Sequence, residues 1–254
     1  MSNKLTMYMI THKSVRYIPK DRTPIFVGNG DNTNNYLRDN TGDNISSKNP
    51  NYCELTACYW IWKNDIDSKY ISIEHYRRFF MKETLFPSPY KFKELKNDLE
   101  KYDAILVRKS KSTLNIRNYY ELIHNKEDLN LAEKAISIYY PEYQEDFQKF
   151  LNGNTASLFN MCAMKKSTFN HYCTWLFTIL DYVEKNTNLD GRSQYQQRAF
   201  GFLSERLLNV WVAHNLKNVK FMNVYYVESN RLLSILKSLK HEKNKKPYNP
   251  IALG

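Results

Sequence analysis

Three groups of polar and charged residues in this sequence have the residue types and spacing that substrate chemistry needs. The first is the segment from Arg38 to Glu54, which is rich in Asn, Asp and Gly. These residue types favour tight turns that present backbone and side-chain amides together. Such a segment can hold a nucleoside base and its ribose, although its composition is more often that of an ordinary surface loop.

The second group runs from Glu74 to Arg78 and follows an apolar run with the pattern of a strand. Ligands of open α/β sheets bind beyond the carboxyl ends of the strands. At that position His75, Arg77 and Arg78 would suit a diphosphate, because a guanidinium forms paired hydrogen bonds with phosphate oxygens. A cluster of surface salt bridges is an equally good interpretation.

The third group lies on one face of a helix expected over residues 193–216. Arg198, Glu205 and Asn209 fall on its polar face, opposite an apolar stripe. At that position Glu205 would suit the role of a general base. Gly201 on the same face indicates close approach by another segment, because a glycine within a helix costs about 1 kcal/mol relative to alanine. The more usual interpretation of such a face is a solvated surface with an ion pair.

Short apolar runs that favour strands alternate with longer amphipathic segments along the whole chain. The expected strands cover residues 5–11, 24–28, 70–75, 104–107, 158–164 and 220–227, and the expected helices cover 51–63, 92–102, 129–140, 167–184, 193–216 and 230–246. This alternation predicts an α/β fold with a mixed, mainly parallel sheet flanked by helices. We expect one domain over residues 1–228, followed by a basic amphipathic helix and tail over 229–254.

The composition restricts the partners and the compartment. The 254 residues carry a formal net charge of +11, which favours anionic partners such as nucleotide diphosphates, nucleic acid or an acidic membrane surface. The N-terminus lacks the apolar core of a signal peptide, and no run approaches the roughly 18 apolar residues of a membrane span. The four cysteines form no CxxC pair, so we expect a cytoplasmic protein with free, reduced thiols.

Five segments resemble the DUF4422 family in the same order along nearly the whole chain. They are ITHK (10–13), RDNTGDNISSKNPNYCELTACYWIWKN (38–64), HYRRFF (75–80), NMCAMKK (160–166) and YQQRAFGFLSERLLNVW (195–211). That family is similar to the GT-A glycosyltransferases of capsular polysaccharide, exopolysaccharide and O-antigen synthesis in bacteria. Some members are described as galactofuranosyltransferases that use UDP-galactofuranose and invert the anomeric centre. The resemblance implies a GT-A-like fold and inverting transfer of a sugar, with galactofuranose as the leading candidate, from a UDP-sugar to a polysaccharide or lipid-linked glycan.

The resemblance also implies a set of site residues, carried over position by position. The UDP would be held by Thr11, His12, Lys13, Arg38, Asp39, Thr41, Gly42, Asp43 and Asn44, together with His75, Arg77 and Arg78. Asn160, Met161, Arg198 and Arg206 would line the sugar and acceptor cleft, with Glu205 as the catalytic base. The sequence departs from the family pattern around residues 190–195, which leaves Asp190 as an alternative base.

The sequence Asp65-Ile66-Asp67 resembles the DxD metal motif of many glycosyltransferases. It precedes a predicted strand, whereas the metal-binding pair should follow one. We therefore expect a turn between a helix and a strand, with binding of Mn²⁺ or Mg²⁺ as the minor alternative. His75, Arg77 and Arg78 would then replace a metal ion as the positive partner of the leaving UDP.

Two functions of other classes compete with sugar transfer. A basic nucleic-acid-binding protein would use the same cations for phosphates and its tyrosines for base stacking. No RNP, helix-turn-helix or zinc-finger pattern supports it, so we expect no nucleic-acid partner. A sugar-nucleotide-binding subunit without catalytic activity is the other alternative.

The C-terminal segment could contact a membrane. Basic residues from Lys237 to Lys246 follow a leucine-rich stretch, and a basic amphipathic helix can lie on anionic lipid. This would suit a lipid-linked acceptor and a peripheral location at the inner face of the plasma membrane. A helix packed on the domain with a frayed basic end is the somewhat favoured alternative.

Overall fold

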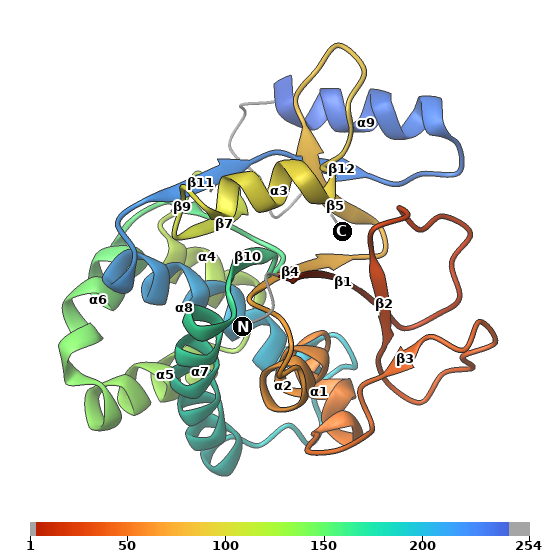
Figure 1. Ribbon diagram of the computed structural model, residues 1–254. Coiled ribbons are helices and arrows are strands. Elements are labelled where there is room, and N and C mark those ends of the chain that lie inside the picture. The colour runs from red at the N-terminus through yellow and green to blue at the C-terminus, as the bar shows by residue number, and fades with distance from the viewer. Residues whose placement is uncertain (1–3, 244–254) are drawn as a thin grey trace.

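A ten-stranded sheet crosses the middle of the molecule in the computed structural model, which describes residues 4–243 (Figure 1). Its main path has the order β11–β7–β10–β4–β1–β2–β3. The strands are β1 (Leu5–Thr11), β2 (Thr23–Phe26), β3 (Leu37–Arg38), β4 (Tyr70–His75), β7 (Ala104–Val107), β10 (Cys162–Lys165) and β11 (Val219–Met222). Neighbours on this path are parallel except β10, which is antiparallel to both β4 and β7. The expected α/β fold with a mainly parallel sheet is confirmed.

The direction of β10 brings distant parts of the chain to one edge of the sheet. β1 and β4 end side by side, with Ile10 opposite His75. β10 begins at the same edge, with Cys162 opposite Ile73. Residues after β1 and β4 and residues before β10 therefore meet at this edge.

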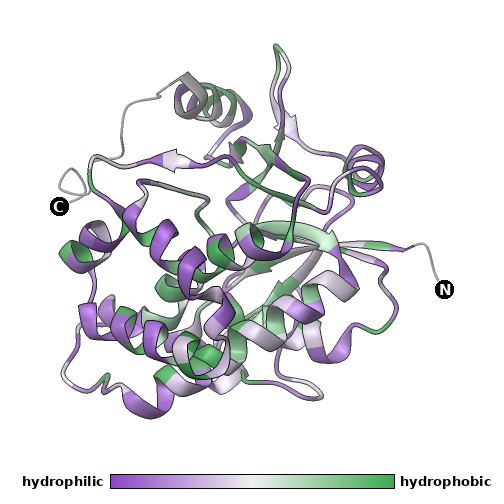
Figure 2. Ribbon diagram, turned by 90° about the vertical axis from the view of Figure 1, so that its left-hand side faces the viewer, coloured by the Kyte–Doolittle hydropathy of each residue, from purple (hydrophilic) through white to green (hydrophobic). Residues whose placement is uncertain are grey.

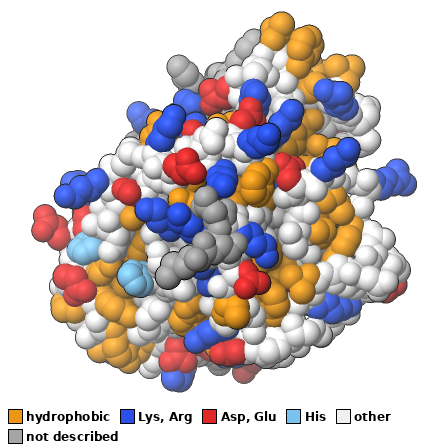
Figure 3. Space-filling view, viewed as in Figure 1, with side chains coloured by type: hydrophobic (Ala, Val, Ile, Leu, Met, Phe, Trp, Pro, Cys, Tyr) orange, Lys and Arg blue, Asp and Glu red, His pale blue; other side chains and the backbone are white. Residues whose placement is uncertain are grey.

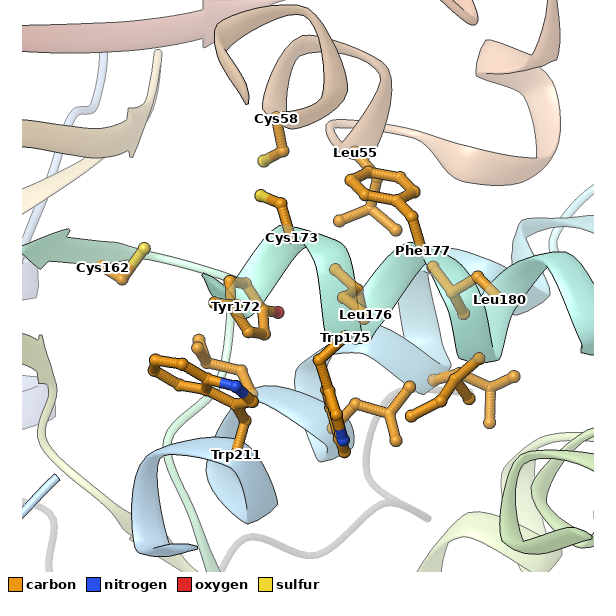
Figure 4. Packing of buried hydrophobic residues seen from close by; sticks show 14 of the residues in the cluster. Leu55, Cys58, Cys162, Tyr172, Cys173, Trp175, Leu176, Phe177, Leu180 and Trp211 are labelled. Carbon is orange, nitrogen blue, oxygen red and sulfur yellow. The ribbon is translucent and has the colours of Figure 1, made fainter. Parts of the chain in front are cut away.

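One face of the sheet is covered by a thick layer of helices (Figures 1 and 2). These helices are α1 (Asn49–Tyr52), α2 (Leu55–Asn64), α4 (Ile116–Ile123), α5 (Lys126–Tyr139), α6 (Gln144–Asn152), α7 (Lys166–Asn186) and α8 (Ala199–Asn215). In Figure 4, the buried side chains of α7 point toward both α2 and α8, with Tyr172 beside Trp211. Cys58, Cys162 and Cys173 are buried in this cluster, and all four cysteines are free, as expected.

The other face is covered more thinly, by α3 (Phe92–Leu99), the small strands β5 (Arg78–Lys82), β6 (Ser88–Pro89) and β12 (Val224–Tyr226), and α9 (Arg231–Lys243). Leu95 and Leu99 of α3 pack against Leu5 and Met7 of β1. A separate short ribbon joins β8 (Ser110–Lys111) to β9 (Thr155–Ala156).

Several predicted elements are divided where the backbone leaves regular geometry. The helix expected over 51–63 is interrupted at Cys53, which has φ 53°. The strand expected from residue 158 begins only at Cys162, because Phe159 and Asn160 have φ 76° and 52°. The helix expected from residue 193 begins at Ala199, after a short 3-10 turn, and the strand expected over 220–227 is split into β11 and β12.

Candidate active site at the strand edge

The turn between β4 and β5 carries two arginines at the sheet edge. β4 ends at His75 and β5 begins at Arg78, so Arg77 lies in the turn and is exposed. The Arg78 guanidinium lies over the Phe159 ring, 4.4 Å from its centroid. Its buried Nε has no hydrogen-bond partner among the described residues. A guanidinium held in this way retains donor capacity for a ligand.

Glu74, one residue earlier, belongs to the core. Its carboxylate accepts from Arg22 at 2.6 and 3.1 Å, and both side chains are almost fully buried. It also accepts from the backbone N–H of Phe80 at 2.8 Å. Glu74 therefore fixes the geometry of the β4–β5 turn from the opposite face of the sheet.

His75 positions the segment before β10 rather than carrying charge. Its Nε2 lies 2.5 Å from the carbonyl oxygen of Phe159, 84 residues away in sequence. Burial lowers the pKa of His75 below its usual range, so the ring is neutral at neutral pH and Nε2–H donates this bond. With this bond His75 holds Phe159, and its contact with a diphosphate stays a prediction.

Glu205 of α8 faces the same segment. Its Oε1 accepts from the backbone N–H of Phe159 at 3.0 Å, and its Oε2 accepts from Arg206 at 2.9 Å. The side chain is only 20% exposed. Burial raises the pKa of Glu205, the neighbouring Arg206 charge opposes this shift, and the Glu54 carboxylate adds to it. Glu205 is thus a partly buried carboxylate rather than a member of a solvated helix face.

Asn160 links α8 to the start of α2. Its Nδ2 donates to Glu54 at 2.7 Å and to the carbonyl of Gly201 at 3.2 Å, while its buried Oδ1 has no partner among the described residues. A side-chain carbon at Gly201 would lie 3.3 Å from Sγ of Cys53. The close approach expected at this glycine is therefore confirmed.

A cavity of about 280 Å³ opens beside Glu205. Four cationic side chains line its wall together with Glu205: Arg78, Lys111, Arg198 and Arg206. The Phe202 and His124 rings stack at 3.9 Å between centroids, and the Tyr195 ring lies 4.9 Å from Phe202 and 6.0 Å from His124. Burial and the Arg206 charge lower the pKa of His124 to about 3, so it is neutral, and its buried Nδ1 has no partner among the described residues. The cavity thus combines positive charge, a carboxylate and an aromatic wall.

The end of β1 contributes to the same electropositive edge. Thr11 is buried, and its hydroxyl donates to the carbonyl of Lys13 at 2.6 Å, which closes the turn after the strand. His12 and Lys13 both lie against Tyr76, with His12 5.4 Å away between ring centroids. Burial, then the charges of Lys13, Arg198 and Arg77, lower the pKa of His12. Cations from the end of β1, the β4–β5 turn and the turn before α8 are therefore close enough to act on the same histidine.

The Arg38 side chain reaches this edge from β3. Its guanidinium donates to the carbonyls of Gly28 at 3.2 Å and Gly30 at 2.9 Å. A side-chain carbon at Gly30 would lie 3.1 Å from the carbonyl oxygen of His12. Arg38 therefore shapes the loop beside His12.

The rest of the predicted uridine loop is anchored on α2. Thr41 accepts from Trp60, Asp43 accepts from Tyr59, and Gly42 packs against Asn64. Asn44 bonds back to the carbonyl of Gly42. These contacts anchor the loop on the middle and the end of α2. The role of Thr41, Gly42, Asp43 and Asn44 in holding UDP stays a prediction.

Two further predicted residues are buried. Asp39 is 1% exposed and accepts from the Ser46 hydroxyl at 2.6 Å, which makes it part of the loop's own framework. Met161 is fully buried in the cluster that includes Leu5 and Leu95. Met161 therefore packs in the core and does not line a cleft.

Comparisons with known proteins agree with this arrangement. A family model described as a domain of unknown function, DUF4422, matches residues 6–216. This chain belongs to the DUF4422 family. It is also similar to a solved structure, the bifunctional glycosyltransferase WbbM in its apo form, with a TM-score of 0.77 and 28% sequence identity. That match covers 90% of this DUF4422 chain and 46% of the WbbM chain, so the chain spans about half the length of that structure. No curated protein matches.

The acidic pair Asp65 and Asp67 of this DUF4422 protein forms the expected turn. Asp65 accepts from the Tyr8 hydroxyl at 2.9 Å and from the backbone N–H groups of Asp67 and Ser68. This turn joins α2 to the start of β4, whereas Glu205 contacts Phe159, which lies beside His75 at the end of that strand. Within residues 4–243, no group of three or more His, Cys, Asp or Glu side chains is arranged to hold a metal ion.

Asp190 is exposed in the loop before α8, where its N–H donates to the side chain of Asn188. Sequence reasoning missed the roles of Glu54, His124 and Phe159. Acidic residues are common at helix starts, because they complement the helix dipole. The sequence therefore did not indicate that Glu54 contacts the candidate site. His124 lies in a segment without an assigned element, and Phe159 acts through its backbone.

Proposed function

We propose that this DUF4422 chain is an inverting glycosyltransferase that moves a sugar from a UDP-sugar to a hydroxyl of a polysaccharide or lipid-linked glycan. Galactofuranose is the leading candidate for the sugar. The observation that carries the proposal is Glu205, a carboxylate of raised pKa in a cavity whose wall is otherwise cationic and aromatic. The similarity to a chain named as a bifunctional glycosyltransferase, at 28% identity over 90% of this chain, supports it.

Glu205 would act as the general base. One carboxylate oxygen takes the proton of the acceptor hydroxyl, and the acceptor oxygen bonds to the anomeric carbon. The bond from that carbon to the diphosphate oxygen breaks on the opposite face, and its electron pair leaves with UDP. A raised pKa makes the ionised carboxylate a stronger base. The N–H of Phe159 and the Arg206 guanidinium hold the carboxylate in place.

Cations at the strand edge would stabilise the departing diphosphate. Arg77, Arg78, Arg198 and Lys13 are the candidates, because they converge around the β4–β5 turn. Fixed positive charge aimed at a developing negative charge lowers the barrier. We infer that these side chains act without a metal ion, and full activity in EDTA supports this, whereas strict dependence on Mn²⁺ contradicts it.

The aromatic wall would bind the acceptor. Rings such as Phe202 and Tyr195 offer apolar faces to the carbon–hydrogen face of a sugar. The unpaired Oδ1 of Asn160 and Nδ1 of His124 are acceptors that sugar hydroxyls could satisfy.

The direct test is a panel of UDP-sugars, including UDP-galactofuranose, scored for donor hydrolysis and for transfer. Glu205→Gln should abolish transfer and preserve UDP binding measured by calorimetry. Glu142→Gln, which changes an exposed glutamate, is the matched control and should leave both unchanged. Normal turnover by Glu205→Gln would show that another group is the base, and tight oligonucleotide binding without UDP binding would favour a nucleic-acid-binding protein.

A further inference from the structure

Helix α9 packs on the domain through two buried serines and the partly buried Ile235. Ser234 and Ser238 are 3% and 1% exposed. The Ser234 hydroxyl accepts from the backbone N–H of Glu228, and that of Ser238 accepts from Tyr226, each at 2.9 Å. These bonds fix the rotation of α9 against β12 and so decide which residues face outward.

The outward face of α9 is apolar and basic at once. Leu232, Leu233 and Leu236 are 66%, 45% and 54% exposed. A helix on a domain surface normally buries such residues. The cations of the same exposed side are Arg231, Lys237 and Lys240. The basic residues expected at 244–246 lie outside the described part of the chain.

A second segment presents apolar side chains at the same end of the molecule. Leu85 and Phe86, in the loop between β5 and β6, are 84% and 70% exposed. β5 pairs with β12, on which α9 packs, and Figures 1 and 2 place the loop tip beside α9. Figure 3 shows hydrophobic side chains gathered at this end, with lysines and arginines next to them.

We propose that Leu85 and Phe86 together with Leu232, Leu233 and Leu236 form a lipid-docking surface for a bilayer that contains anionic lipid. Apolar side chains would enter the interface while the adjacent cations meet lipid headgroups. No helix within residues 4–243 is long and apolar enough to cross a membrane, so the contact is interfacial. If two copies paired symmetrically through α9, the cations of one copy would face those of the other and repel them. Anionic lipid instead offers negative charge to these cations, so we favour lipid as the occupant.

This surface is coupled to the strand edge by the backbone. The N–H of Val227, just before α9, donates to the carbonyl of Arg77 at 3.0 Å. Docking would therefore hold the β4–β5 turn close to the bilayer. The proposal does not depend on glycosyl transfer, because it rests only on exposure and charge.

Vesicle flotation tests the proposal with the full chain. Wild type should float with vesicles of phosphatidylcholine and phosphatidylglycerol, and much less with phosphatidylcholine alone or in high salt. Leu85→Asp/Phe86→Asp and Leu232→Asp/Leu236→Asp should each reduce the bound fraction about tenfold or more, because the apolar burial is lost. Ile66→Asp is the matched control, since Ile66 is 89% exposed in the turn before β4, at the other edge of the sheet.

Circular dichroism and thermal melting confirm that the variants are folded, since all five positions are exposed. Unchanged flotation of either double variant, or an equal loss for Ile66→Asp, overturns the joint surface. A wild-type dimer in light scattering that Leu232→Asp/Leu236→Asp converts to monomer also overturns it, in favour of a second copy of the chain.

Discussion

At the scale of single residues, burial decides the chemistry of the candidate site more than residue type does. His75 and His124 are histidines without charge, because burial lowers the pKa of each. Burial also raises the pKa of Glu205, since it disfavours the charged carboxylate. The positive charge at the site therefore comes from arginine and lysine side chains, and the histidines act as neutral hydrogen-bonding groups.

The raised pKa of Glu205 predicts the pH dependence of transfer. The base must be ionised, so kcat/KM should rise with pH through a pKa above that of an ordinary glutamate. Arg206 opposes the upward shift, so Arg206→Met should move this acid limb to still higher pH. Initial rates between pH 4 and about 8 measure it, and an acid limb that moves to lower pH would contradict Glu205 as the base.

The buried pair of Arg22 and Glu74 predicts a large stability effect. Arg22→Met leaves an unpaired carboxylate in the core and should cost about 3–5 kcal/mol in the free energy of unfolding at neutral pH. Removing Arg22 raises the folded-state pKa of Glu74 further, so this loss should shrink as the pH falls through that pKa. Urea unfolding at two pH values measures it. Lys185→Met, which breaks an exposed pair with Asp181, should leave the free energy of unfolding almost unchanged.

At the scale of elements, α8 holds the segment before β10 in its irregular conformation. Asn209 exchanges two hydrogen bonds of 2.8 Å with the backbone of Ser157, and Glu205 accepts from Phe159 one turn earlier along the helix. The next two residues of this segment, Phe159 and Asn160, have positive φ, and β10 begins after them. The helix therefore places Phe159 and Asn160 against the strand edge.

Asn209→Ala should release this segment. Two buried backbone groups of Ser157 lose their partner, which should cost about 2–3 kcal/mol of stability. Asn209 does not line the cavity. The released segment carries the Phe159 N–H that holds Glu205, so kcat should fall. Loss of that N–H should raise the pKa of Glu205 further and move the acid limb of the pH profile to higher pH. Asn215→Ala is the control, because it also removes a hydrogen-bonding side chain from α8, but near Tyr143. It should lower stability with little effect on kcat, measured at saturating substrate. Equal losses of kcat in both variants would assign Asn209 a general structural role.

Sequence reasoning predicted the regular elements better than the contacts between them. β1, β4 and β7 were predicted with their observed bounds, because each is an apolar run bounded by polar residues. β5 was missed, since its first residues were assigned to a binding motif. The anchoring of the Thr41–Asn44 segment was not predicted, because its composition indicates turns but not that Trp60 and Asn64 of α2 hold it. The bond between His75 and Phe159 joins residues 84 apart, which no local periodicity encodes.

At the scale of the whole molecule, three buried cysteines report on global unfolding. Burial raises the pKa of Cys58, Cys162 and Cys173, and raises that of half-buried Cys53 to about 11. The thiolate is the reactive form, so all four should react slowly with a disulfide reagent at pH 8 in the native state. Absorbance of the released thiolate measures it. In denaturant four thiols should react rapidly, and fast reaction of any thiol in the native protein would contradict this packing.

The reversed strand at the centre of the sheet also fixes an order of assembly. In the described sheet, β3, β2, β1 and β4 form one block from the first 75 residues, while β7 and β11 form another. Only β10, at residues 162–165, joins the two blocks. During synthesis the N-terminal block must therefore wait, with one long edge unpaired, until nearly two-thirds of the chain has left the ribosome. Such an edge is a template for pairing with other chains, so this interval is when the nascent protein most needs a chaperone.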